Sequence, residues 1–81
     1  MDIQSPNTRT HDLGLAAALV SCGFKLRATT RDGNGRFYFA FRQTSDLTEA
    51  IDEYWANTLN VPARVYSDNI KMLKGRIYSE Q

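Results

Sequence analysis

Apolar and polar positions follow two different periods along the chain, and these periods predict three helices and one pair of strands. The first helix is expected over residues 11–22, because almost no polar residue interrupts the segment from Leu13 to Val20. Thr10 precedes this segment as an N-cap, and Gly23 follows it where a left-handed residue commonly ends a helix. A helix that is apolar on several sides packs against more than one neighbour, so this segment is expected in the core.

The clearest local signal is a β-hairpin around the turn sequence Asp32-Gly33-Asn34-Gly35, whose residues tolerate a positive φ. A register that pairs Arg31 with Arg36 sorts the flanking strands into one apolar and one basic face. The apolar face carries the pairs Thr30 with Phe37, Ala28 with Phe39 and Leu26 with Phe41. Since a two-stranded ribbon is only marginally stable alone, we expect helices to cover the apolar face.

Two further segments show apolar residues at helical spacing. The second helix is expected to begin near Asp46, where Asp46 and Glu49 resemble a capping box and Ser45 is a rival cap. It is expected to end around residues 59–60. The third helix is expected to carry Pro62 at its first position and to run to about Tyr78.

These elements, in the order helix, hairpin, helix, helix, predict a single α+β domain with the topology α-β-β-α-α over residues 10–78. Residues 1–9 are expected to form a flexible lead-in, in which Asp2–Gln4 could add a short edge strand, and residues 79–81 a frayed tail. The expected core draws on all elements and comprises Leu13, Ala17, Val20, Leu26, Phe37, Phe39, Phe41, Ile51, Trp55, Ile70 and Leu73.

The composition is that of a small globular domain in a reducing compartment. The chain has 81 residues, of which 42% are hydrophobic and 23% are charged. Its single cysteine, Cys22, excludes an internal disulfide framework. The longest apolar run, Leu15 to Val20, is far shorter than a membrane span, and no basic region precedes it as in a secretory signal. We therefore expect a cytoplasmic protein without a membrane partner.

Charge is distributed unevenly, although the formal net charge is only +1. Residues 24–43 carry five bases against one acid, residues 44–60 carry four acids and no base, and residues 61–81 carry four bases against two acids. A first candidate binding surface lies on the basic outer face of the hairpin and comprises Lys25, Arg27, Arg36, Tyr38 and Arg42. A second lies on the third helix and comprises Arg64, Lys71 and Lys74.

The basic hairpin face has three explanations. Lysine and arginine side chains protect the edges of an exposed ribbon from aggregation. They could instead pair with the acidic second helix, within the chain or across a dimer. They could also contact nucleic acid, with the basic side chains on phosphates and Tyr38 stacked on a base. The basic positions of the third helix are either a solvated face or a contact surface.

Catalytic and metal-binding residues are scarce. His11 is the single histidine and is expected at an exposed helix start, and Cys22 is expected as a buried thiol. One histidine and one cysteine cannot complete a tetrahedral metal site, and no phosphate-binding loop is present. The sequence therefore predicts neither an enzyme nor a bound cofactor or metal. Tyr54 and Trp55 are expected in the core, whereas an exposed Trp55 would mark a protein contact.

Several short segments, most of them expected core positions, form a pattern over residues 10–78. They are Asp12-Leu13, Leu15–Leu19, Gly23-Phe24, Phe37–Phe41, Ile51–Trp55, Ala63-Arg64, Leu73-Lys74 and Ile77-Tyr78. This pattern resembles a small family of uncharacterised domains, known chiefly from bacterial and bacteriophage genomes. The resemblance implies the predicted fold and a phage or mobile-element setting, in which short proteins often act by binding. It carries over no functional residue.

The lack of a catalytic constellation and the opposed charged segments favour a non-catalytic binding module. We expect it to act on another protein, as an accessory or inhibitor of phage or mobile-element type. The alternative is a small nucleic-acid-binding protein that uses the outer face of the hairpin. A domain of this size buries only about 60–65% of its unfolded surface, so we also consider a homodimer formed through the third helix.

Overall fold

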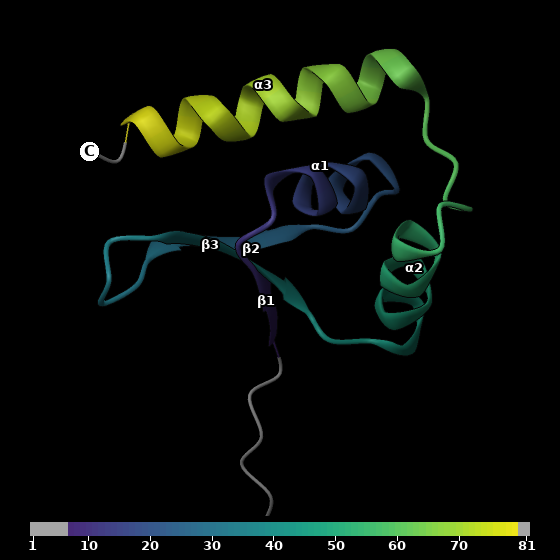
Figure 1. Ribbon diagram of the computed structural model, residues 1–81, viewed down its shortest axis with the longest axis horizontal. Coiled ribbons are helices and arrows are strands. Elements are labelled where there is room, and N and C mark those ends of the chain that lie inside the picture. Colours follow the sequence, from purple (N-terminus) through teal and green to yellow (C-terminus); the bar gives the residue numbers. More distant parts are fainter. Residues whose placement is uncertain (1–6, 80–81) are drawn as a thin grey trace, which may run out of the picture.

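The computed structural model describes residues 7–79 and arranges them as a three-stranded antiparallel sheet and three helices (Figure 1). The elements are β1 (Asn7–Thr10), α1 (Leu13–Ser21), β2 (Leu26–Arg31), β3 (Phe37–Arg42), α2 (Ser45–Trp55) and α3 (Ala63–Ser79). The predicted α+β class is therefore confirmed, with one strand more than the predicted hairpin. Within residues 7–79, no helix is long and apolar enough to cross a membrane.

The additional strand, β1, makes β3 the central strand of the sheet, whose order is β1-β3-β2. β1 runs antiparallel to β3, with Asn7 opposite Arg42 and Thr10 opposite Phe39. Residues 7–9, expected in a flexible lead-in, therefore belong to the sheet. The edge strand considered at Asp2–Gln4 lies outside the described residues, as do residues 80–81 of the expected tail.

The hairpin differs from the predicted register by one residue at its turn. Asp32 faces Arg36, because the Asp32 amide donates to the Arg36 carbonyl over 2.7 Å. Residues 33–35 therefore form a three-residue loop, and Gly35 has the positive φ of 82° that such a loop requires at its last position. The Asp32 carboxylate accepts the amides of Asn34 and Arg36, at 2.9 and 3.1 Å, and so closes the turn.

A β-bulge in β2 compensates for this shift. Phe39 lies opposite Thr29 rather than Ala28, but the register changes between Leu26 and Ala28, so that Leu26 lies opposite Phe41 as predicted. Arg27 is the extra residue of the bulge. The bulge therefore places Leu26 opposite the buried Phe41 and Ala28 opposite the buried Ala40.

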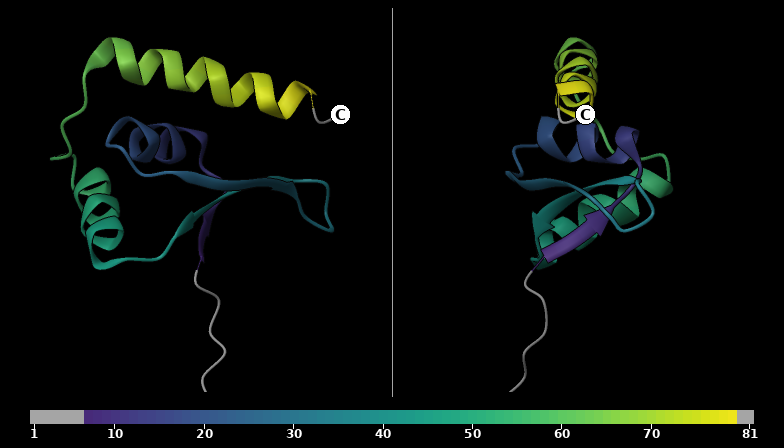
Figure 2. Two further views of the ribbon diagram at one scale, coloured as in Figure 1. Left: turned by 180° about the vertical axis from the view of Figure 1, so that it is seen from behind. Right: turned by 90° about the vertical axis from the view of Figure 1, so that its left-hand side faces the viewer.

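Helix α1 lies between the sheet and α3, as the views of Figures 1 and 2 show. Five consecutive residues, Leu15 to Leu19, are buried, which confirms that this helix packs on more than one side. α3 packs mainly against α1 rather than on the sheet, and α2 contacts α1 at one end of the molecule. The helices were expected to cover the apolar face of the hairpin, but α3 lies outside α1 rather than on the sheet.

The helices begin and end at different residues from those expected. α1 begins at Leu13, because the Asp12 carboxylate, not Thr10, accepts the Leu15 amide over 2.9 Å. Its last residue is Ser21, one before the predicted end, and Gly23 follows as the predicted left-handed residue with a φ of 100°. α2 begins at Ser45, because the Thr44 hydroxyl, rather than Asp46, caps it by accepting the Leu47 amide.

The end of α2 lies several residues before the predicted one. Asn57 has a φ of 64°, and the Thr58 amide donates to the Glu53 carbonyl over 2.9 Å. This left-handed residue with its paired backbone bonds is a Schellman motif, which stops the helix after Trp55. Pro62 immediately precedes α3, and its carbonyl accepts the Tyr66 amide.

The core forms where α1 meets the sheet and the other two helices. Four expected core residues are buried, namely Ala17, Phe39, Phe41 and Leu73. Five others pack against them while partly buried, namely Leu13, Val20, Leu26, Ile51 and Ile70. Phe37 is also only half-buried, and Trp55 is exposed. Three large buried side chains were not in the expected set, namely Leu15, Leu19 and Leu47.

Candidate functional site

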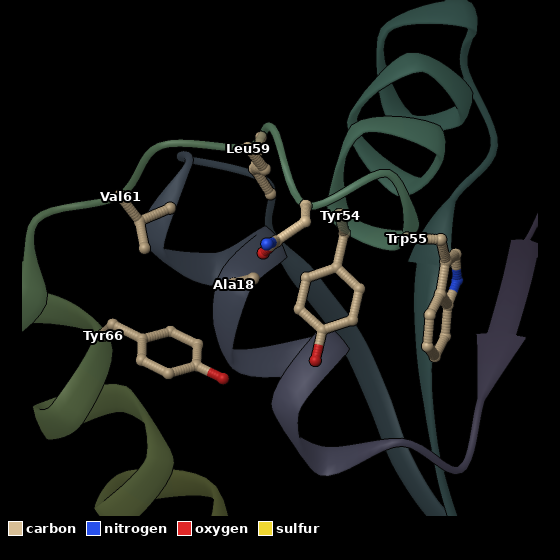
Figure 3. A pocket seen from close by; sticks show the side chains of 7 residues that line it. Ala18, Tyr54, Trp55, Leu59, Val61 and Tyr66 are labelled. Carbon is tan, nitrogen blue, oxygen red and sulfur yellow. The ribbon is translucent and has the colours of Figure 1, made fainter.

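A hollow of about 460 Å³ opens where α1, the end of α2, the α2–α3 connection and the start of α3 meet. We call it the aromatic groove, and its lining residues are Ala18, Tyr54, Trp55, Asn57, Leu59, Val61 and Tyr66. Figure 3 shows Leu59, Val61 and Tyr66 on one side of the hollow and Tyr54 and Trp55 on the other. The groove is therefore built from aliphatic and aromatic side chains with few polar groups.

The groove owes its shape to the early end of α2. The left-handed Asn57 turns the chain away from the helix axis, so that residues 58–62 lead back toward the start of α3. Leu59 packs against the core from this connection, and Val61 is half-buried beside it. A longer α2 that ended around residues 59–60, as the sequence pattern predicted, would have carried Leu59 on a helix.

Two tyrosine hydroxyl groups meet α1 at Gly14, which lies just below the groove. The Tyr66 hydroxyl donates to the Gly14 carbonyl over 3.3 Å. A Cβ atom at Gly14 would lie 2.8 Å from the Tyr54 hydroxyl oxygen and 3.2 Å from that of Tyr66. This glycine therefore allows the close approach of the two hydroxyl groups, and a larger residue would require at least the Tyr54 side chain to shift.

The Tyr54 hydroxyl group is held in its neutral form. Burial raises the pKa of Tyr54, and the negative charge of Asp12 and the hydrogen bond with Tyr66 raise it further. Figure 3 shows the hydroxyl groups of Tyr54 and Tyr66 directed into the same space. The walls of the groove are thus apolar, and the Tyr54 hydroxyl group at one end is polar but uncharged.

Trp55 is 63% exposed, which overturns the expectation that it belongs to the core. Its ring stands edge-on to that of Tyr54, with 5.0 Å between the ring centroids. Successive residues of a helix point about 100° apart, so Tyr54 and Trp55 do not both face inward on a helix that, like α2, is covered on one narrow face. Leu47, Ala50 and Tyr54 take the inner face of α2, and this leaves Trp55 at the border between the groove and solvent.

The outer face of α2 is acidic and forms no ion pair with any of the residues that the structure describes. Its four carboxylates are all exposed, namely Asp46, Glu49, Asp52 and Glu53. Between residues 7 and 79, the single ion pair with N–O atoms within 4.0 Å joins His11 to Asp32. Direct pairing of the acidic helix with the basic hairpin inside the chain, one of the three explanations from the sequence, is therefore wrong for these residues.

The predicted basic surface of the hairpin is divided by the fold. Three of its five members, Lys25, Arg27 and Arg42, line a second hollow of about 400 Å³. We call this second hollow the basic hollow, and its other lining residues are Gly23, Phe24, Phe41, Thr44 and Asp46. Arg36 lies at the hairpin turn and Tyr38 lines a different hollow with Arg9, His11 and Asp32, so these two do not join the others.

Tyr38 is covered by its neighbours. The Arg9 guanidinium lies 5.0 Å from the centre of the Tyr38 ring, and the His11 imidazole stands edge-on to it. A base could therefore not stack on this ring without displacing Arg9. His11 itself contacts the hairpin, with Nδ1 2.5 Å from the Phe37 carbonyl oxygen and Nε2 3.6 Å from the Asp32 carboxylate.

The second predicted surface lies on the exposed side of α3. Arg64, Lys71 and Lys74 are all exposed, and so are the apolar side chains Val65 and Met72.

Cys22, expected as a buried thiol, is exposed at the end of α1. Partial burial of its sulfur and the nearby Glu53 raise the pKa of Cys22, which favours the unreactive thiol. The described residues hold no group of three His, Cys, Asp or Glu side chains that could bind a metal ion.

A family model described as Domain of unknown function (DUF5659) matches residues 6–79. The match extends over nearly the whole chain and confirms the resemblance to a small uncharacterised family that the sequence pattern indicated. No curated protein and no solved structure matches the chain.

Proposed function

The chain belongs to this family of domains of unknown function, and we propose that it is a non-catalytic module that binds another protein through the aromatic groove. The observation that carries this proposal is Trp55, which is 63% exposed beside a hollow with apolar walls. Tryptophan and tyrosine contribute most strongly to binding when they lie at the centre of a protein interface. A partner that covers Trp55 would remove a large apolar surface from water.

We infer the charge of the partner from the acidic face of α2. Asp52 and Glu53 lie three and two residues before Trp55 in the same helix and are exposed. A partner segment with an apolar side chain for the groove and lysine or arginine beside it would therefore complement both features. The basic residues would steer the approach, and the apolar side chain would supply most of the affinity.

The setting of this binding is also a proposal. We infer an accessory or inhibitor protein of a phage or mobile element from the resemblance of the sequence pattern alone, and a cytoplasmic location from the lone cysteine. Homodimerisation through α3 is a further proposal, which the exposed Val65 and Met72 support. Sedimentation at high micromolar concentration tests it, since a monomer mass would remove it.

Nucleic-acid binding by one extended face of five hairpin residues is the alternative function. The geometry favours it less, because the ring of Tyr38 is covered by Arg9, and Arg36 lies apart at the turn. Any contact with phosphate groups would depend on the residues of the basic hollow, which lie outside the aromatic groove.

Peptide display tests the proposed function. A random peptide library would be selected on the wild-type protein, and the retained peptides would then be titrated against the Trp55→Ala variant. We expect the retained peptides to combine an aromatic or aliphatic residue with lysine or arginine. Because Trp55 is the single tryptophan of the chain, its fluorescence should report their binding directly.

A matched control distinguishes binding in the aromatic groove from nonspecific binding to an exposed aromatic side chain. Tyr78 is 69% exposed near the end of α3 and does not line the groove. Trp55→Ala should weaken peptide affinity by roughly tenfold or more, a loss typical of a central aromatic contact, whereas Tyr78→Ala should leave it unchanged. Peptides that bind all three proteins equally would refute the proposal.

A further inference from the structure

The basic hollow gathers three cationic side chains from two strands and a connecting segment at one place. Lys25 precedes β2, Arg27 is the extra residue of its bulge, and Arg42 ends β3. Bulges often redirect a side chain at functional positions. The regular pairing predicted from the sequence would have placed Arg27 on the outer face beside Ala40, so the bulge is what changes its position relative to β3.

These three charges are not neutralised by the described part of the chain. Lys25, Arg27 and Arg42 are exposed, and none has a carboxylate oxygen within 4.0 Å among residues 7–79. Asp46 is the one acidic residue in the lining, so the hollow carries an excess of two positive charges. Like charges held around one hollow repel one another, and an anion between them would relieve that repulsion.

We propose that the basic hollow binds the phosphate group of a nucleotide, either free or as part of a nucleic-acid strand. Two guanidinium groups and one ammonium group match an oxyanion that offers several acceptor atoms, because arginine binds phosphate through paired donors. Phe24 is half-buried in the same lining and offers an aromatic surface for a base. The volume of about 400 Å³ lies within the usual range for a small-ligand site.

Fluorescence anisotropy with a labelled oligothymidylate tests this assignment. Titrations at 50 mM and 150 mM salt would use the wild type and the Arg27→Gln, Arg42→Gln and Arg36→Gln variants. Arg36 is the matched control, because it lies in the same hairpin and loses the same charge but does not line the hollow. All three substituted positions are exposed, and circular dichroism would verify that each variant keeps the fold.

The expected result is a loss of roughly tenfold or more in affinity for Arg27→Gln and for Arg42→Gln, as for a charged hydrogen-bond partner. Arg36→Gln should change the affinity by less than about twofold, and each loss in the hollow should reduce the salt dependence by about one ion. Equal losses in all three variants would refute the site, because they would indicate a general attraction of the basic hairpin for polyanions.

Competition identifies the source of the phosphate. Displacement of the oligonucleotide by a 5′-mononucleotide would assign the hollow to free nucleotides, whereas retention of the complex would assign it to a strand. Failure of both the oligonucleotide and the mononucleotide to bind at 50 mM salt would overturn the proposal. The aromatic groove shares no lining residue with this hollow, so the outcome is independent of the proposed protein binding.

Discussion

Replacement of Gly14 by alanine tests whether Tyr54 and Tyr66, which line the aromatic groove, need a residue without a side chain at position 14. The added Cβ would lie 2.8 Å from the Tyr54 hydroxyl oxygen, closer than packed atoms tolerate. Alanine gains up to about 1 kcal/mol over glycine inside a helix, and Gly14 lies in the first turn, where the gain is smaller. Overpacking of a filled region costs about 1–3 kcal/mol. We therefore expect Gly14→Ala to lower the free energy of unfolding by about 1 kcal/mol.

Urea unfolding followed by circular dichroism measures this effect, and a double-mutant cycle identifies its cause. Tyr54→Phe removes the nearest oxygen, so Gly14→Ala should be neutral or stabilising in that background. The two substitutions should thus show a coupling energy of about 1–2 kcal/mol. Such coupling is expected only for groups that contact each other.

Gly75→Ala in α3 is the control for helix propensity. A Cβ at Gly75 would meet no other atom within 4 Å, so this substitution should stabilise the protein by about 0.5–1 kcal/mol. If Gly14→Ala stabilised the wild type as much as Gly75→Ala does, the close approach of Tyr54 would not constrain residue 14. The inference that the Tyr54 hydroxyl group packs tightly against residue 14 would then fail.

Two further predictions concern turns. Asn57→Ala should destabilise the protein by about 1 kcal/mol, because Asn57 has a φ of 64°, and Asn57→Gly should not; thermal unfolding of both variants checks this. The backbone amide of Asn34 holds the pKa of Asp32 below its usual range. The stabilisation that the ionised Asp32 carboxylate gives to the fold is therefore fully present above the ordinary aspartate pKa of about 3.9. This stabilisation is lost as pH falls through the lowered pKa. Asp32→Asn should lose less stability than the wild type between pH 7 and pH 2.5 in urea unfolding, and an equal loss would contradict this.

The sequence pattern was informative where several residues share one period. Leu26 lies opposite Phe41 as predicted, and Phe39 and Phe41 are buried, because alternation along β3 specifies its inner face over three phenylalanines. The turn register was wrong by one residue, since Asp32 can pair with Arg36 without moving any apolar residue of β3. The bulge at Arg27 then absorbs the difference, and no single-residue signal in β2 announces it.

Other features escaped prediction because their signal lies outside the local pattern. β1 (Asn7–Thr10) has no apolar residue, and it forms because β3 offers an unpaired edge. Trp55 has the helical spacing of a core residue, but α2 needs only a narrow inner face against α1. The same spacing therefore fits a buried and an exposed tryptophan, and the packing of neighbouring helices decides between them.

The division of the predicted basic surface shows why charge counting alone misleads about function. Five residues of the hairpin appeared to share one face, yet the bulge and the Arg9–Tyr38 contact leave three of them around one hollow. That hollow lies at the start of α2, while Trp55 lies at its end, with the acidic face between them. A net charge of +1 thus conceals two surfaces of opposite charge, for which we propose an anion and a basic partner. Substitution of Arg27 should therefore leave peptide binding intact, and substitution of Trp55 should leave nucleotide binding intact.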